Sequence, residues 1–391
     1  MDGKKIARRV SGQAYSDSSD IDLRRFGSKG PMLPMLGLGG QVTFQHGTEA
    51  EAENLFETVV DAGVRYIDTA HDYGASQERL GRYMAAYPDH EFFVATKTAK
   101  RDRDDFMREL DENIELLGRT PDVLHVHSVN KGEQQEILRS GGALESAHIA
   151  RDRGLCRFVG LTSHDDPDSV WEVARWGGGV DVTMVALNAA DTRFLDRYIP
   201  WCRSKGIAVV AMKVMGRGTL VRPDGPGVRS GSEALTFALS CPVDMAVVGF
   251  SFPEEVQELT DSVRGFDPMT AAEMRDLVDG TALYADDVWF YRGEMDWDKA
   301  VDRRPSLDWQ LPSPMSKLGS AMSSRDRLDD VMRDYKGLAW VTRGAAPSEM
   351  AKAFRKLLSK ADAESLIDDL ERDDELHPDV IDFLRMKQSK R

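Results

Sequence analysis

The sequence predicts an α/β protein whose main part is a (β/α)8 TIM barrel. Between about residues 36 and 263, short apolar runs alternate with longer amphipathic, charged stretches, as in repeated βα units around a parallel sheet. There are eight apolar runs, the number of strands that closes such a sheet into a barrel. The chain of 391 residues holds a barrel of about 250 residues and leaves a further segment of domain size.

The strands are expected at the eight apolar runs: Met35–Gly39, Arg65–Thr69, Phe92–Thr96, Val123–Ser128, Phe158–Thr162, Val182–Leu187, Ala208–Val214 and Met245–Phe250. The segments between them, such as Glu49–Ala62 and Asp104–Leu117, repeat apolar residues every three or four positions and are expected to be helices. Right-handed crossovers would place these helices outside the barrel.

An open doubly wound sheet is the competing architecture. Its dinucleotide-binding form carries a G-x-G-x-x-G turn between the first strand and the first helix. In this chain residues 37–44 read GLGGQVTF, without the third glycine or the start of a helix. The first junction therefore favours the barrel.

The segments on either side of the barrel are predicted to differ from it. Residues 1–21 are expected to be a flexible tail, and Asp22–Pro34, rich in glycine and proline, a hairpin or loop that plugs one end of the barrel. The barrel region is expected to span residues 22–285, ending after a helix that opens on a capping box from Thr270 to Glu273.

Residues 286–391 are expected to form a C-terminal extension, irregular at first and then mostly helical. Its clearest helical stretches are Ser348–Ala361 and Asp362–Arg372. The irregular part carries a group of aromatic residues that we expect to pack over the barrel: Trp289, Phe290, Tyr291, Trp297 and Trp309.

Composition excludes several classes of function. The net charge of -15 argues against a nucleic-acid partner, because phosphate-backbone binders need a surplus of Lys and Arg. No run approaches the roughly 18 apolar residues of a spanning helix, so no membrane partner is expected. Arg8 and Arg9 are not followed by the apolar run of an export signal, which favours a cytoplasmic location. The oligomeric state is left open.

The three cysteines, Cys156, Cys202 and Cys241, are widely spaced and form no C-x-x-C pattern. We expect buried, reduced thiols rather than ligands of a metal or an iron–sulfur cluster.

Four ionisable residues are expected at the carboxyl ends of strands, where barrel enzymes carry their reacting groups. Asp68 ends the second strand, Tyr73 follows it, Lys97 ends the third strand and His127 ends the fourth. A buried lysine paired with a carboxylate stays charged, and its charge is expected to lower the pKa of a neighbouring phenol. These residues therefore predict a proton-transfer site.

Three motifs around these residues resemble the aldo-keto reductase family. Residues 66–74 (YIDTAHDYG) are similar to its pattern in which Asp-Thr-Ala precedes Tyr-Gly by two residues. Residues 94–97 (VATK) resemble its strand-ending lysine, and residues 122–127 (DVLHVH) its strand-ending histidine. The resemblance covers about residues 22–263 and implies a barrel enzyme that binds an extended nicotinamide cofactor.

The resemblance also implies the role of each residue. Hydride would pass between nicotinamide C4 and a carbonyl carbon while Tyr73 exchanges a proton with the oxygen. Lys97 would tune Tyr73, Asp68 would hold Lys97, and His127 would orient the carbonyl. The same groups serve alcohol oxidation in the reverse direction.

Cofactor contacts follow the family less closely. The run GLTSH at residues 160–164 stands where many relatives have G-x-S-N, so two short hydroxyls would bind the carboxamide. Residues 212–218 (MKVMGRG) resemble a bacterial branch, some members of which carry C-terminal iron–sulfur cysteines that this chain lacks. The expected cofactor contacts are Gly40, Thr162, Ser163, Met184, Met212, Lys213, Gly216, Arg217, Gly218, Gly249, Ser251, Glu255 and Glu258.

The choice of nicotinamide cofactor is predicted from charge. NADP-preferring relatives often carry Arg or Lys after the eighth strand for the 2′-phosphate, whereas this chain has Glu254, Glu255 and Glu258. Carboxylates repel a phosphate and accept hydrogen bonds from a ribose hydroxyl, so NAD is favoured over NADP.

The function expected from these observations is hydride transfer between a nicotinamide cofactor and a carbonyl or secondary alcohol, with sugar-like metabolites among the expected substrates. Two alternatives stay open. An enzyme that retains its nicotinamide could oxidise a substrate transiently to allow isomerisation or elimination, and a cofactor-sensing scaffold protein could use the C-terminal extension to contact a partner.

Overall fold

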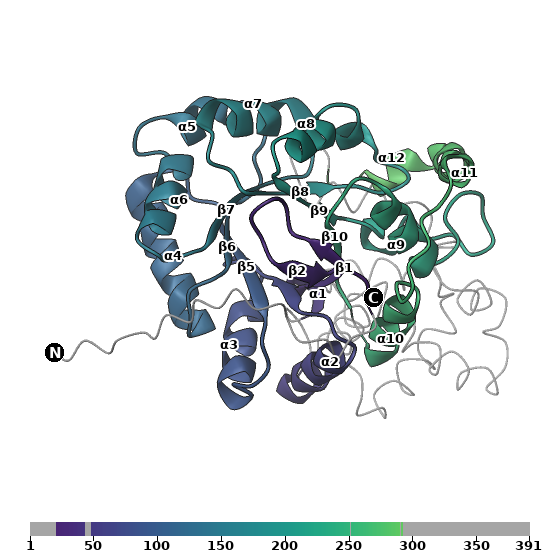
Figure 1. Cartoon of the computed structure of the whole chain (residues 1–391), viewed down its shortest axis with the longest axis horizontal. Helices are drawn as coiled ribbons and strands as arrows, with labels where there is room; N and C mark the ends of the chain where they lie inside the picture. Colours follow the sequence, from purple (N-terminus) through teal and green to yellow (C-terminus); the bar gives the residue numbers. More distant parts are fainter. Residues whose placement is uncertain (1–20, 44–47, 251, 290, 292–391) are drawn as a thin grey trace, which may run out of the picture.

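The computed structural model describes residues 21–43, 48–250, 252–289 and 291. Eight parallel strands form a closed barrel in the order β10-β3-β4-β5-β6-β7-β8-β9 (Figure 1). These strands are β3 (Leu36–Gly39), β4 (Tyr66–Asp68), β5 (Phe93–Thr98), β6 (Val123–Val126), β7 (Phe158–Ser163), β8 (Val182–Ala186), β9 (Ala208–Met212) and β10 (Met245–Val248). Each expected strand is present, so the predicted (β/α)8 barrel is confirmed.

Helices surround this barrel in the order of the chain (Figure 1). They are α1 (Gly40–Thr43), α2 (Glu49–Asp61), α3 (Ser76–Ala86), α4 (Arg103–Leu117), α5 (Gln134–Leu138), α6 (Ala143–Asp152), α7 (Pro167–Gly177), α8 (Tyr198–Ser204), α9 (Gly231–Ser240), α10 (Pro253–Asp261), α11 (Ala271–Ala282) and α12 (Ala285–Val288). Short 3-10 turns η1 (Arg193–Leu195) and η2 (Gly216–Gly218) lie in two loops.

Local sequence signals explain where several helices begin and end. Thr48 and Glu51 form a capping box that opens α2, and Thr270 and Glu273 form the box expected before α11. Asp102 accepts a hydrogen bond from the backbone amide of residue 104 and so caps α4. That helix ends at Gly118, whose φ of 68° suits a residue without a side chain.

The expected N-terminal hairpin is present and closes the amino end of the barrel. Strands β1 (Leu23–Arg25) and β2 (Met32–Pro34) pair antiparallel. Phe26, between them, is buried among the aromatic rings of Tyr66, Phe93 and Phe158 at centroid distances of 5.8, 5.3 and 6.3 Å. The plug is therefore an aromatic cluster at the start of the barrel interior.

The interior changes from apolar to polar along the barrel. Because side chains alternate along a strand, Phe93, Ala95 and Lys97 point inward together from β5. The first two belong to the buried apolar cluster inside the barrel, whereas Lys97 lies at the carboxyl end. Polar groups are thus gathered at one face of an otherwise apolar barrel.

The junction after the first barrel strand differs from the expectation. Strand β3 is followed directly by one helical turn, α1, so the expected absence of a helix start there was wrong. Gly40 allows this turn, because a Cβ there would lie 2.7 Å from the carbonyl oxygen of Asp68. Such close approach requires glycine.

The described residues that follow residue 285 still pack against the barrel. Val288 and Tyr291 are fully buried in the main core, and the Trp289 Nε1–H donates to the carbonyl of Ala190 at 2.6 Å. Trp289 and Tyr291 therefore pack over the barrel, as expected. The remaining expectations lie outside the described residues: Phe290, Trp297, Trp309, the tail at residues 1–20 and the helices after residue 323. The division into domains therefore stays a prediction.

Candidate active site

A buried ion pair lies at the centre of the site. Asp68 ends β4 and Lys97 lies near the end of β5, and the Lys97 Nζ is 2.7 Å from Asp68 Oδ2. The ammonium also donates to the carbonyl of Thr69 at 2.9 Å. Burial raises the pKa of the Asp68 carboxyl and lowers that of the Lys97 ammonium, while the pairing opposes both shifts. The pair holds Lys97 in one position.

Tyr73 lies beside this pair and is 8% exposed. The Lys97 Nζ lies 4.4 Å from the centroid of the phenol ring. Burial raises the pKa of the Tyr73 hydroxyl well above its usual range, and the charges of Asp68 and Asp72 raise it further. We expected Lys97 to lower this pKa. The difference arises mainly because burial disfavours the charged phenolate, and so the phenol keeps its proton at neutral pH.

His127 completes the group from the loop after β6. Its ring centroid lies 6.1 Å from that of Tyr73, with the rings nearly perpendicular. Burial, followed by the charge of Lys97, lowers the pKa of the His127 imidazole well below its usual range. The ring is therefore neutral, with one nitrogen donating and one accepting. The four residues expected from the sequence come together at the carboxyl end of the barrel.

The loop that carries His127 is held by its backbone. Arg101 donates to the carbonyls of His127 and Ser128, at 2.8 and 2.9 Å, and forms an ion pair with Glu133. Ser128 has a φ of 51°, a conformation unusual for a residue other than glycine. Strain in such a residue is maintained only where neighbours fix it.

Thr162 and Ser163, two expected cofactor contacts, belong to the same network. The Thr162 hydroxyl accepts from the Ser128 amide at 2.7 Å, and the Ser163 hydroxyl donates to the Val129 carbonyl at 3.0 Å. Thr162 therefore keeps a proton to donate, whereas Ser163 keeps lone pairs that accept.

The loop after β9 has an unusual backbone. Lys213 and Arg217 have φ values of 59° and 54°, and the adjacent Gly216 and Gly218 have 53° and 84°. The amides of both glycines are bonded within the loop, to the carbonyls of Lys213 and Met215 at 2.8 Å. These two glycines shape the loop rather than offering free amides. Met212, which precedes the loop, belongs with Met184 to the apolar cluster inside the barrel.

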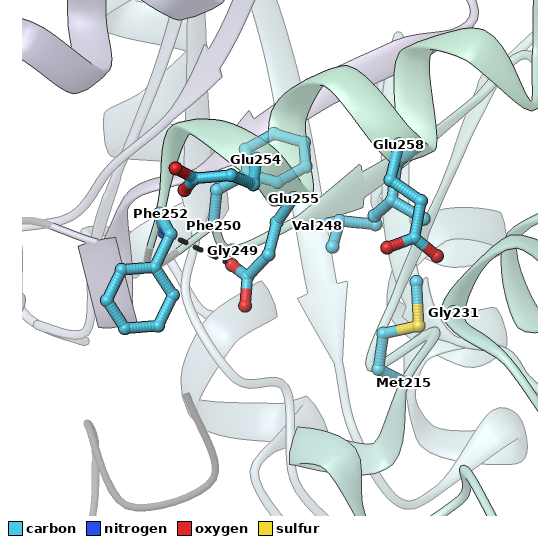
Figure 2. A pocket seen from close by; sticks show the side chains of 10 residues that line it. Met215, Gly231, Val248, Gly249, Phe250, Phe252, Glu254, Glu255 and Glu258 are labelled. Carbon is cyan, nitrogen blue, oxygen red and sulfur yellow. Dashed lines mark hydrogen bonds between the residues drawn. The ribbon is translucent and has the colours of Figure 1, made fainter. Parts of the chain in front are cut away.

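A cavity of about 490 Å³ opens beside this loop, within the size range of small-molecule sites. Its walls come from the end of β10, the start of α10, α9 and Met215 (Figure 2). The lining residues are Met215, Gly231, Val248, Gly249, Phe250, Phe252, Glu254, Glu255, Glu258 and Leu259. Gly249, Glu255 and Glu258 were expected cofactor contacts, whereas Ser251 lies outside the described residues.

The charged groups of this cavity are all carboxylates among the residues described. Figure 2 shows Glu255 and Glu258 pointing to the same side of α10, Glu255 beside Phe252 and Glu258 toward Met215. The Glu255 carboxylate accepts a hydrogen bond from the Phe252 amide at 3.3 Å, at the first turn of the helix. The helix N-terminus thus already holds an anion of its own chain.

Some residues at this face were missed by the sequence reasoning. His125 points into the barrel two positions before His127, over Gly160, where a Cβ would lie 2.2 Å from its Nδ1. Alternation along β6 was the signal that could have revealed it. Asn188, in the loop after β8, was not among the expected site residues. Its amide donates to the carbonyl of Lys213 at 2.9 Å and to the hydroxyl of Tyr291 at 3.0 Å.

Comparison with known proteins identifies the family. The sequence model of the aldo/keto reductase family matches residues 35–233. The chain belongs to this family. Aldo-keto reductases are oxidoreductases that use NAD(P)H and act on small-molecule carbonyl or alcohol substrates, which agrees with the expected class of enzyme. The match includes β3 to β9 and all four residues of the site.

Curated aldo-keto reductase relatives include two sugar dehydrogenases by name. L-galactose dehydrogenase of Arabidopsis thaliana is 26% identical over 238 residues, covering 55% of this chain and 74% of that protein. D-threo-aldose 1-dehydrogenase of a Pseudomonas species is 27% identical over 233 residues, covering 50% and 70%.

Solved structures agree on the fold. The holo form of an aldo-keto reductase from Bacillus halodurans superposes with a TM-score of 0.56 at 19% identity, over 67% of this chain and 97% of that one. Within the described part of the chain, no three or more His, Cys, Asp or Glu residues are grouped to hold a metal ion, and no helix has the length and apolar character to cross a membrane.

Proposed function

We propose that this aldo-keto reductase transfers hydride between NAD(H) and a carbonyl or secondary alcohol, with Tyr73 as the general acid and base. The observation that carries the proposal is the convergence of Tyr73 and His127 on the buried Asp68–Lys97 pair. A neutral phenol, a neutral imidazole and an ammonium at one barrel mouth suit proton exchange with a carbonyl oxygen.

Each residue has a distinct part in the reaction. The bound nicotinamide supplies or accepts the hydride at the carbonyl carbon. Tyr73, which keeps its proton because its pKa is raised, donates that proton to the oxygen in reduction. Lys97 stabilises the phenolate that remains, and Asp68 holds Lys97 in place. The neutral His127 donates a hydrogen bond that orients the carbonyl.

The residues described fit a nicotinamide cofactor. Thr162 has a proton to donate to a carboxamide oxygen, and Ser163 has lone pairs for a carboxamide N–H. Met184 and Met212 provide an apolar, polarizable surface for the ring. Gly40 keeps α1 close to Asp68, and Gly216 and Gly218 shape the loop that carries Arg217, which we propose as a contact of the cofactor.

NAD rather than NADP is supported by the glutamates of α10. A 2′-phosphate in the adjoining cavity would face Glu254, Glu255 and Glu258 among the described residues. It would also compete with Glu255 for the Phe252 amide. A ribose hydroxyl can instead donate to a carboxylate without repulsion.

A sugar-like substrate is supported by the two relatives named as sugar dehydrogenases. A cytoplasmic location is supported by the free, buried thiols of Cys156, Cys202 and Cys241, which suit a reducing compartment.

The function is tested with Tyr73→Phe. Wild-type protein is screened for oxidation of NADH by aldehydes and aldoses, and the best substrate is used for the variant. The variant is expected to lose about 10²- to 10⁴-fold in kcat because the proton donor is gone. Its Kd for NADH, measured by fluorescence titration, is expected to change less than about threefold, since the phenol does not hold the nucleotide.

Tyr87→Phe is the matched control. Tyr87 donates its hydroxyl proton to Glu53 outside the site, so this variant is expected to keep wild-type kcat. Unchanged kcat in Tyr73→Phe would refute the acid–base assignment. Absence of any binding of NADH or NADPH to wild-type protein would refute the oxidoreductase proposal itself and favour a scaffold function.

A further inference from the structure

The loop after β9, residues 213–220, has a backbone that its own residues do not favour. It carries four of the expected cofactor contacts, and all four have positive φ values of 59°, 53°, 54° and 84°: Lys213, Gly216, Arg217 and Gly218. A lysine or an arginine in a left-handed conformation loses free energy, and such a conformation persists only where the surrounding structure fixes it. The loop therefore depends on contacts from other parts of the fold.

The start of this loop is tied to Tyr291 through Asn188. The side-chain amide of Asn188 donates to the carbonyl of Lys213 at 2.9 Å and to the hydroxyl of Tyr291 at 3.0 Å. The Tyr291 hydroxyl in turn donates to Asp191 Oδ2 at 3.1 Å. Tyr291 is fully buried, so removal of its hydroxyl would leave a buried amide without one of its partners. The hydroxyl thus fixes the side chain that holds the loop.

The middle and the end of the loop contact the same part of the chain as Tyr291. A Cβ on Gly216 would lie 2.7 Å from Val288 Cγ1, so the valine packs directly against the backbone of this glycine. The hydroxyl of Tyr284 donates to the carbonyl of Leu220 at 2.9 Å. Tyr284, Val288 and Tyr291, which we call the clamp residues, therefore hold the loop at three points.

The loop that these residues hold forms one wall of the cavity at α10. Met215, between Lys213 and Gly216, lines that cavity, and Glu258 points toward it from the opposite wall (Figure 2). A Cβ on Gly231 would lie 3.6 Å from Met215 Cε, an ordinary packing distance. A displacement of the loop would therefore move the wall that faces the proposed cofactor.

We propose that the clamp residues hold the loop 213–220 in its cofactor-binding conformation before the cofactor arrives, with Tyr291 as a positioning residue that acts through Asn188. This inference rests on the proposed oxidoreductase function, because the ligand of the loop is the nicotinamide cofactor of that proposal. A loop that is formed for only a fraction of the time weakens the apparent affinity by that fraction. The clamp therefore sets the affinity for the cofactor and not the rate of the chemical step.

Tyr291→Phe, which removes the hydroxyl and keeps the ring, tests the clamp. Hydrogen exchange of the free protein, followed by mass spectrometry, should become at least about tenfold faster in residues 213–220. If the loop is then formed about a tenth of the time, the Kd for NADH rises about tenfold. At saturating NADH, kcat should fall by no more than about threefold, because the four reacting groups are unchanged. Tyr284→Phe, which removes the bond to Leu220, should act in the same direction.

Tyr198→Phe is the matched control. Tyr198 is 1% exposed, and its hydroxyl lies 3.0 Å from Thr183 Oγ1 of β8. This variant also loses a buried tyrosine hydroxyl, but one that bonds a strand instead of the loop. Its free energy of unfolding should fall about as much as that of Tyr291→Phe, while exchange in residues 213–220 and the Kd for NADH should stay at wild type.

The outcomes separate the clamp from the proposed function. Unchanged exchange in both Tyr291→Phe and Tyr284→Phe would overturn the clamp, while NADH binding by wild type would keep the proposed function. Faster exchange with an unchanged Kd would overturn the role of the loop in cofactor binding. A loss of kcat without a change in Kd would overturn the positioning role. If wild type binds neither NADH nor NADPH, the proposed function fails, and this inference fails with it.

Discussion

Lys213 illustrates how a single residue can lower the stability of the fold that holds it. Burial lowers the pKa of its ammonium to about 7, and its backbone is left-handed. Both features cost free energy, because a buried ammonium loses hydration and a lysine avoids positive φ. Enzymes often tolerate such costs at their functional sites. The cost is measurable in the absence of ligand.

Replacing Lys213 by Met is expected to raise the free energy of unfolding at pH 6.5 by about 1 kcal/mol or more. The lysine pKa is lowered from 10.5 to about 7 in the folded protein, so the unfolded chain binds more protons between these pH values. Wild-type stability should therefore rise from pH 7 toward 10.5. The advantage of the variant is expected to shrink over this range.

Urea unfolding of wild type and Lys213→Met at pH 6.5 and 9.5 measures this effect. Lys205→Met, which removes an exposed lysine, is the control and should change stability little at either pH. An advantage of Lys213→Met that stays the same at both pH values would contradict the assigned titration.

At the scale of single residues, the sequence predicted where the site residues lie better than it predicted their pKa values. Asp68, Lys97 and His127 could be assigned because strand ends meet at one face of a barrel, a rule that needs no side-chain geometry. The raised pKa of Tyr73 could not be predicted, because it depends on burial of the phenol and on how close the charges of Asp68 and Asp72 lie. Spacing along a chain does not encode either quantity.

Among the secondary-structure elements, the N-terminal hairpin has a purely structural role. It lies at the amino end of the barrel, opposite the reacting groups, and contributes Phe26 to the aromatic cluster there. In barrel folds this end is associated with stability and the carboxyl end with chemistry. A substitution in the hairpin should therefore change the free energy of unfolding without changing substrate binding.

Phe26→Ala is expected to lower the free energy of unfolding by about 3 kcal/mol, because it leaves a cavity in a packed aromatic cluster. KM values of the folded fraction should stay at wild type. Urea unfolding and steady-state kinetics measure the two effects. Leu23→Ala, at a residue of the same hairpin that is 37% exposed, should cost far less. A raised KM in Phe26→Ala would show that the hairpin also supports the site.

Element prediction succeeded where periodicity was strong and failed where a single contact decided the outcome. The eight strands are buried runs of apolar residues, which a sequence displays directly. The single turn of α1 depends on Gly40 packing against the Asp68 carbonyl, a contact between residues far apart in the chain. The bonds that Asn188 makes to Lys213 and Tyr291 are likewise contacts of tertiary structure.

At the scale of the whole molecule, cofactor preference can be measured as a change in stability, because cofactor binding is linked to folding. A ligand that binds only the folded state stabilises it by about 2.7 kcal/mol at 100 times its Kd. For a barrel of this size that corresponds to a rise in Tm of about 5–10 °C. In the proposed complex Glu254, Glu255 and Glu258 of the α10 cavity face the adenosine end of the cofactor, so NADPH should give less than half the rise given by NADH at equal concentration.

Glu258→Arg tests the electrostatic origin of this difference. Glu258 points into the cavity in Figure 2, so an arginine there replaces repulsion of a 2′-phosphate with attraction, and the NADPH-induced rise in Tm should approach or exceed that of NADH. Glu115→Arg, an exposed position on α4, makes the same change in net charge and should leave the difference unaltered. If NADPH stabilises wild type as strongly as NADH, the glutamates do not select the cofactor. The family assignment would stand, because it depends on the match over residues 35–233 and not on α10.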